Sequence, residues 1–273
     1  MSSLLPAPRV VTKAAARVRL GERYRVTLRP TPQSQAFKPE LMHLDVVYED
    51  EDLRVIHKPA GLVVHPAPGN WTGTLLNGLL ALDPQAVMLP RAGIVHRLDK
   101  DTSGLMVVAR SRRCMDALVA MIGAREVHRE YLAVAYRQWN GAKRRDVEAP
   151  VGRDPRTRLR MAVVDLSRQS GKEARTSFDC LDSQGEACLV QCTLHSGRTH
   201  QIRVHMAHIG HPLLGDSLYA GPMNMGIGRQ ALHAFRLSFV HPITHKPLVF
   251  ESVLPPDMTS LLAALMLRRP QQT

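Results

Sequence analysis

The sequence predicts an α+β fold. Segments with strand patterns and segments with helical spacing mix along the chain without the regular strand–helix–strand alternation of a parallel sheet. The 273 residues are 44% hydrophobic, which is enough for a sizeable core, and only 4% aromatic, so that core must be mostly aliphatic. No internal repeat or low-complexity tract interrupts this pattern.

The N-terminal region is basic and rich in proline. Within residues 1–40 we expect a short hairpin over 11–28, where apolar and polar residues alternate, and a linker over 29–40. The pattern changes near residue 44. Residues 45–56 predict two strands joined by an acidic turn, and the Lys58-Pro59 step ends the second strand.

Strands and helices then follow to the C-terminus. The spacing predicts helices over 74–82, 115–124 and 199–209, and a last helix to about residue 267 with Asp257 as its N-cap. In the third of these, Ile202, Met206 and Ile209 share one face. Strands are expected over 105–109, 130–135, 176–181, 188–194, 232–240 and 248–253.

The net charge of +12 indicates a polyanionic partner. Nucleic acid and an anionic membrane surface both fit, and basic clusters at 110–113, 143–145 and 153–160 favour nucleic acid. The four cysteines form no Cys-x-x-Cys pair, and we find neither a signal peptide nor an apolar run of transmembrane length. These features are typical of a cytoplasmic protein with reduced thiols and disfavour a zinc ribbon.

One polar loop carries two carboxylates. Asp99 and Asp101 lie in residues 93–109 (GIVHRLDKDTSGLMVVA), just before an apolar run that predicts a buried strand. Arg97 and Lys100 flank Asp99, so it should stay ionised near neutral pH. Such a carboxylate can act as nucleophile, base or metal ligand. An ion-paired surface turn explains the same residues equally well.

A second polar cluster spans residues 195–216 (HSGRTHQIRVHMAHIGHPLLGD). A metal site is disfavoured because His200 and His205 are five residues apart, no HExxH pattern occurs, and Arg198 and Arg203 would repel a cation. The cluster fits an anion-binding surface better, with a histidine-rich packing helix as the alternative. Neither a GxSxG elbow nor a phosphate-binding glycine loop is present, which leaves a lone carboxylate working with arginines on a polyanion.

Six blocks of sequence between residues 44 and 267 resemble the RluA family of pseudouridine synthases, in the branch that modifies large-subunit ribosomal RNA. The blocks are His57-Lys58-Pro59-x-Gly61-x-x-Val64-His65-Pro66, His96-Arg97-Leu98-Asp99-x-Asp101-x-Ser103-Gly104, Arg129-Glu130-Tyr131, Gly197-Arg198-x-His200-Gln201-Ile202-Arg203-x-His205, His211-Pro212-Leu213-x-Gly215-Asp216 and Arg229-Gln230-Ala231-Leu232-His233-Ala234.

This resemblance implies a fold and a reaction. The expected fold is a long mixed, mostly antiparallel sheet that spans two subdomains, with a central active-site cleft flanked by helices and loops. The implied enzyme is an isomerase that breaks the bond from ribose to N1 of uracil, rotates the base and rejoins it through C5, without cofactor or metal. Asp99 is the implied catalytic residue, acting by nucleophilic attack or by electrostatic stabilisation of an opened sugar.

The resemblance also implies roles for the neighbours of Asp99. Arg97 would fill the place of the extruded uridine in the RNA, and Tyr131 would stack on the base or transfer a proton. Arg203 would pair with Asp99, whereas Asp101 would only support the loop. Apolar walls for the uracil are expected from Leu98 and Ile202. Further substrate-binding residues are expected at Lys58, His65, Arg198, His200 and Gln201.

The domain boundary and the partner are further expectations. Residues 1–40 resemble the remnant of a truncated alpha-L-type RNA-binding domain plus a linker, and residues 41–273 would form the catalytic domain. The expected substrate is large-subunit ribosomal RNA or a pre-ribosomal particle, with tRNA as the rival. A catalytically idle RNA-binding ribosome-assembly factor and a histidine-dependent metal nuclease are the alternatives from other classes. We expect a cytoplasmic monomer without membrane contact.

Overall fold

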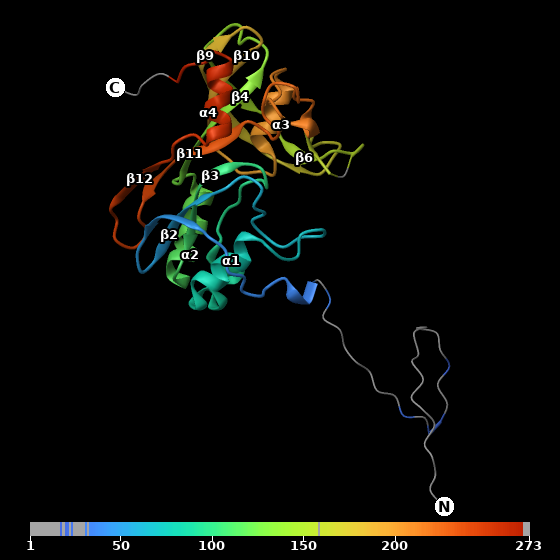
Figure 1. The fold of residues 1–273 in the computed structure, drawn as a ribbon, viewed down its shortest axis with the longest axis vertical. Coiled ribbons are helices and arrows are strands. Elements are labelled where there is room, and N and C mark those ends of the chain that lie inside the picture. Colours follow the sequence, from blue (N-terminus) through green and yellow to red (C-terminus); the bar gives the residue numbers. More distant parts are fainter. Residues whose placement is uncertain are drawn as a thin grey trace, which may run out of the picture. The chain divides into compact units, whose positions relative to one another are not determined.

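The computed structural model describes residues 17, 20, 21, 23, 31, 33–157 and 159–269 (Figure 1). The chain divides into two compact units, Met1–Thr31 and Pro32–Thr273. Only residues 17, 20, 21 and 23 of the hairpin expected over residues 11–28 are described, so this hairpin lies almost wholly outside the described residues. The helices and strands named below belong to the second unit.

One mixed sheet forms the frame of this unit. Its strands run in the order β1-β2-β3-β11-β4-β10-β9-β5, with β12 paired to β11, and only β3 and β11 pair in parallel. The predicted α+β class with a long, mostly antiparallel sheet is confirmed. The strands of this sheet are β1 (Asp45–Glu49), β2 (Leu53–Lys58), β3 (Ser103–Ala109), β4 (His128–Tyr136), β5 (Arg144–Glu148), β9 (Arg175–Gln184), β10 (Ala187–Leu194), β11 (Leu232–Val240) and β12 (Pro247–Glu251).

Helices cover the sheet, and a small second sheet lies beside it. The helices are α1 (Leu75–Leu82), α2 (Arg112–Ala124), α3 (Gln201–His208) and α4 (Pro256–Ala264), with 3-10 turns η1 (Gln33–Gln35), η2 (Pro84–Met88), η3 (Pro90–Gly93) and η4 (Ser217–Tyr219). The second sheet contains β6 (Val151–Arg153), β7 (Met161–Val163) and β8 (Gly171–Lys172). No helix within the described part of the chain is long and apolar enough to span a membrane.

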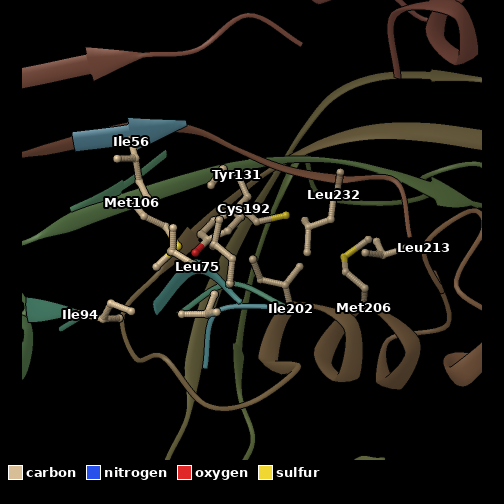
Figure 2. Close-up of a cluster of buried hydrophobic side chains, with 14 of the residues drawn as sticks. Ile56, Leu75, Ile94, Met106, Tyr131, Cys192, Ile202, Met206, Leu213 and Leu232 are labelled. Carbon is tan, nitrogen blue, oxygen red and sulfur yellow. The ribbon is translucent and has the colours of Figure 1, made fainter. Parts of the chain in front are cut away.

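The two faces of the main sheet bury different clusters. Successive strand residues point to opposite faces, so Tyr131 and Ala133 of β4 lie in one cluster while Leu132 and Val134 lie in another. The first cluster packs against α1 and α3, and Figure 2 shows Tyr131 in it, with Ile202 of α3 close by. On the opposite face, α4 covers the half of the sheet around β4 and β10, and α2 covers the half around β2 and β3.

Residues 33–40 pack against α1, although the sequence indicates a linker there. The amide of Asn77 donates hydrogen bonds to the carbonyls of Ala36 and Lys38 (3.2 and 2.8 Å), and Ala36 is buried. Asn77 also completes a capping box with Thr74, the N-cap of α1. The segment is therefore part of the second unit. The domain boundary at residue 40 stays a prediction.

The predicted start of the last helix is wrong by two residues. The N-cap of α4 is Pro255, and Asp257 lies in the first turn. Its carboxylate accepts a hydrogen bond from the backbone N–H of Met258 (2.8 Å) and forms an ion pair with Arg229 (2.6 Å). Pro256 occupies the first helical position, where proline is favoured because it lacks the N–H that a helix leaves unpaired there. Aspartate is favoured both as an N-cap and in the first turn, so Asp257 alone does not fix where the helix begins.

We predict that Gly104→Ala destabilises the fold where β3 meets β11. Gly104 has a φ of +119°, and a Cβ there would lie 2.2 Å from the carbonyl oxygen of Ala234. The expected loss is about 2 kcal/mol or more in the free energy of unfolding, measured by urea denaturation. Gly123→Ala is the control: it lies in α2 with nothing within 4 Å of a new Cβ, and it should stabilise by about 0.5 kcal/mol. Equal effects of the two substitutions would contradict the prediction.

Candidate active site

The loop that carries Asp99 is held through three consecutive backbone carbonyls. The carbonyl of Asp99 accepts from the N–H of Thr102 (3.1 Å), and that of Lys100 accepts from the N–H of Gly61 (2.9 Å). The carbonyl of Asp101 accepts from the Arg229 guanidinium (3.0 Å). Three consecutive paired carbonyls restrict the backbone of the loop, so the Asp99 side chain projects from a supported position.

Lys58 also holds this loop, through a hydrogen bond to the carbonyl of Lys100. Its side chain is buried, and its ammonium donates to the carbonyls of Pro59, Leu62 and Lys100 at 2.7, 2.9 and 2.9 Å. Burial lowers the pKa of Lys58 to about 7, although the nearby carboxylates favour the charged form. Because all three donors are occupied by the protein, the expected contact of Lys58 with substrate does not fit its position.

Arg203 connects Asp99 to a second carboxylate, that of Asp216. Its Nη1 lies 3.2 Å from Oδ2 of Asp99, and its Nε and Nη2 donate to the two carboxylate oxygens of Asp216 at 2.7 and 2.8 Å. The side chains of Arg203 and Asp216 are 7% and 1% exposed, whereas that of Asp99 is 16% exposed. The predicted Asp99–Arg203 pair is present, and the fork-shaped contact with Asp216 fixes the guanidinium in the plane that reaches Asp99.

Tyr219 completes the support of Arg203. The Arg203 guanidinium lies over the Tyr219 ring, 4.9 Å from its centre. The Tyr219 hydroxyl accepts from the N–H of Met161 (2.9 Å) and lies 2.9 Å from Nδ1 of His200. Burial lowers the pKa of His200, so the ring is neutral near pH 7. Its Nε2 lies 3.9 Å from Oδ1 of Asp99, which is beyond hydrogen-bonding distance.

Sequence reasoning missed the roles of Asp216 and Tyr219. Asp216 is in a block that resembles the family, yet its position along the chain does not reveal its partner. Tyr219 follows three residues later in η4 and is not part of any block. One signal was available for Asp216. If Arg203 is buried, it needs a buried carboxylate as its partner, and Asp216 is an acidic residue in a neighbouring block.

A cavity of about 1100 Å³ opens beside Asp99. Tyr131 lines it with 4% of its surface exposed. Burial, with help from Asp99 and against the effect of Arg129, raises the pKa of Tyr131 to about 12, so the phenol stays neutral at ordinary pH. Asp99 also borders a second cavity, of about 380 Å³, together with Arg203 and Asp216.

Most of the predicted site residues meet in the larger cavity. Besides Asp99 and Tyr131, these are His65, Arg97, Leu98, Arg198, His200, Gln201 and Ile202. Gln201, however, is buried, and its amide already bonds within the protein: its oxygen accepts from Ser196 and the Arg198 N–H, and its NH2 group donates to Arg175 and Thr176. Gln201 therefore braces the loop before α3, while the exposed Arg97 lies open to a partner.

Comparison with known proteins gives the same family throughout. A model of the RNA pseudouridylate synthase family matches residues 52–208. The chain is 50% identical over 260 residues to a ribosomal large subunit pseudouridine synthase D of Neisseria meningitidis, covering 90% of this chain and 68% of that protein. A protein of the same name from Xanthomonas campestris is 44% identical over 261 residues, covering 91% of this chain and 77% of its own length.

Solved structures are similar in fold. Human RNA pseudouridylate synthase domain containing 4 gives a TM-score of 0.64 at 25% identity, covering 83% of this chain and 95% of that one. Human RNA pseudouridylate synthase domain containing 1 gives a TM-score of 0.65 at 24% identity, covering 90% and 94%. The latter likeness concerns the fold alone.

We predict that Arg203→Met destabilises the protein by about 3–5 kcal/mol, because it leaves the buried Asp216 carboxylate without its partner. Urea denaturation measures this loss. The double variant Arg203→Met/Asp216→Leu removes both charges and should recover most of the stability. A loss below about 1 kcal/mol in the single variant would show that Asp216 does not depend on Arg203.

We predict that stability falls as the pH drops from 6.5 towards 4, partly through His96. Burial and Arg129 lower the pKa of His96 to about 3, so the folded state keeps it neutral while the unfolded chain takes up a proton near pH 6.5. In His96→Asn the unfolding free energy should depend less steeply on pH, by up to about 1.4 kcal/mol per pH unit. His43→Asn, at an exposed position, is the control. Parallel wild-type and His96→Asn curves would refute the assignment.

Proposed function

This chain belongs to the RNA pseudouridylate synthase family, and from that premise we propose that it isomerises specific uridines to pseudouridine in large-subunit ribosomal RNA. The single observation that carries the proposal is the Asp99 carboxylate, held by Arg203 at one oxygen and open to the cavity at the other. Within residues 33–157 and 159–269, Oδ1 of Asp99 accepts no hydrogen bond, so it is available to a substrate.

Asp99 acts on the sugar of the extruded uridine. The N1–C1′ bond must break before C5 of the base can bond to C1′, and C1′ becomes electron-poor as N1 leaves. Once C5 has bonded to C1′, C5 gives up its hydrogen as a proton and N1 takes up a proton, so the product is an isomer of the substrate. A carboxylate oxygen facing that carbon either forms a bond to it or stabilises the opened sugar by its charge. Both routes need the same geometry, and Arg203 supplies it by fixing Oδ2 and leaving Oδ1 free.

Tyr131 and the apolar walls hold the base. The pKa of Tyr131, about 12, keeps its hydroxyl protonated, so it serves as a stacking surface or hydrogen-bond donor and not as a base near pH 7. Leu98 and Ile202 are buried and line the same cavity, where they keep water away from the opened sugar. Arg97 is exposed at the cavity and takes the place of the extruded uridine in the RNA.

Several parts of the proposal concern the partner. The relatives named above support ribosomal RNA over tRNA, and the net charge of +12 supports binding to an extended RNA. We propose that the protein acts in the cytoplasm as a monomer. We also propose that residues 1–40 comprise the remnant of an RNA-binding domain of the alpha-L type, which contributes to substrate affinity, followed by a linker whose last residues, 33–40, pack against α1.

We predict that Asp99→Asn lowers pseudouridine formation by more than about a hundredfold, because an amide neither attacks C1′ nor carries the stabilising charge. Binding of the RNA should stay within a few-fold of the wild type. Nucleoside mass spectrometry after incubation with unmodified large-subunit ribosomal RNA measures the product, and filter binding measures affinity.

Asp101→Asn is the matched control for this experiment. It makes the same change two residues away, at a side chain for which the described structure shows no hydrogen bond, and should keep turnover within a few-fold. Normal turnover in Asp99→Asn, or equal losses in both variants, would overturn the role of Asp99. Absence of pseudouridine with the wild type would overturn the choice of RNA.

A further inference from the structure

Four buried side-chain nitrogen atoms at the larger cavity form no hydrogen bond within the described residues: Nε of Arg129, Nε of Arg175, Nε2 of His65 and Nδ1 of His96. Nε of Arg175 has an ion-pair partner, the Glu148 carboxylate at 3.1 Å, which leaves three atoms with none. Buried polar atoms in folded proteins are nearly always paired, so several unpaired ones around one cavity point to a ligand that pairs with them.

Arg129 is the most unusual of the three. It lies on β4 two residues before Tyr131, so both side chains face the cavity side of the sheet. Arg129 is only 6% exposed, yet its guanidinium forms neither a hydrogen bond nor an ion pair with any described residue. A buried charge without a partner is costly, and the cost is removed when an anion enters.

Gly197 makes room for this guanidinium. A Cβ at Gly197 would lie 2.9 Å from Nη1 of Arg129 and 3.8 Å from its central carbon, so the guanidinium rests against the bare backbone of the loop before α3. No positive φ requires glycine at this position. The absence of a side chain at Gly197 therefore provides room for the Arg129 guanidinium, whose donors stay open to the cavity.

His96 adds a neutral donor beside Arg129. The backbone N–H of Val107 donates to Nε2 of His96 at 3.1 Å, so Nε2 carries no proton and the neutral ring has its proton on Nδ1. Arg129 is close enough to lower the pKa of His96. The wall thus offers donors from both side chains, and six arginine side chains line the cavity against three carboxylates.

We propose that Arg129 and His96, with the space left by Gly197, form a binding site for one phosphate of the RNA strand next to the extruded uridine. A phosphate matches a donor-only wall and neutralises the Arg129 charge, whereas a uracil carbonyl would accept a hydrogen bond and leave the charge unbalanced. The inference rests on the proposed function, because it takes RNA as the ligand. It makes Arg129 a substrate-binding residue and leaves the chemistry to Asp99.

The test compares RNA binding and turnover of the wild type, Arg129→Met, Arg129→Lys and Lys246→Met. KCl is varied from about 50 to about 300 mM, because phosphate contacts weaken over this range. Single-turnover conversion of a transcript of large-subunit ribosomal RNA gives two quantities: the enzyme concentration for half-maximal rate, and the rate at saturation. Filter binding of the same transcript gives the affinity without turnover. Lys246 is exposed in the β11–β12 turn and controls for the loss of one positive charge.

We expect Arg129→Met to raise the half-maximal concentration about tenfold or more, with the saturated rate within a few-fold. The slope of log affinity against log salt should shrink by about 0.7 to 0.9, the value of one phosphate contact. Arg129→Lys should restore the slope because it restores the charge, and Lys246→Met should match the wild type. Gly197→Ala keeps the charge but displaces the guanidinium, and it should also weaken binding.

An unchanged slope in Arg129→Met would overturn the phosphate site, as would a loss confined to the saturated rate, which would place Arg129 at the reacting base. If Arg129→Met fails to fold, Arg129→Gln decides, because it removes the charge and keeps a polar side chain, and an unchanged salt slope in that variant would overturn the inference. A wild type that binds the transcript but forms no pseudouridine contradicts the proposed function alone, since the salt slopes from filter binding still test the phosphate contact.

Discussion

The site depends on one buried guanidinium shared by two carboxylates. Asp216 takes two donors of Arg203 and balances its charge, and Asp99 takes a third. The group of three therefore keeps a net negative charge, and the more exposed member, Asp99, carries it towards the cavity. An isolated Arg–Asp pair would hold the carboxylate equally well but would also neutralise it. The second carboxylate therefore lets Arg203 hold Asp99 while the group keeps a negative charge beside the cavity.

Much of the fold could be predicted from local pattern. The strand pair over residues 45–56, the helix that begins after Thr74 and the apolar strand after residue 103 all have periodicities or caps that a short window reveals. The start of α4 was placed wrongly because Pro256 and Asp257 are both of residue types common at helix starts, and the ion pair of Asp257 with Arg229 depends on tertiary structure. Residues 33–40 have linker composition, yet Asn77 fixes them through bonds that composition does not record.

The family resemblance predicted Asp99, Tyr131 and Arg203 as site residues from three separate blocks. The structure brings Asp99 and Arg203 into contact although they lie 104 residues apart in the sequence. Lys58 shows the limit of such transfer. A lysine in a polar block suggests contact with an anion, but its three donors serve the carbonyls of the neighbouring loop. Whether a charged side chain faces a ligand or the backbone is decided by burial, which short motifs do not encode.

The setting of Asp99 beside one continuous sheet has a consequence for how this enzyme distinguishes its targets. Strands β3, β11 and β4 are neighbours in one sheet (Figure 1), and β3 pairs with β11 where Gly104 lies against Ala234. A base that is stacked and paired must leave the helix before a carboxylate can reach its sugar, so the RNA has to bend and unstack whatever the protein contributes. We therefore expect uridines in segments that bend and unstack at low cost to be favoured. Selectivity would then come partly from the mechanical compliance of the RNA itself, in addition to its base sequence.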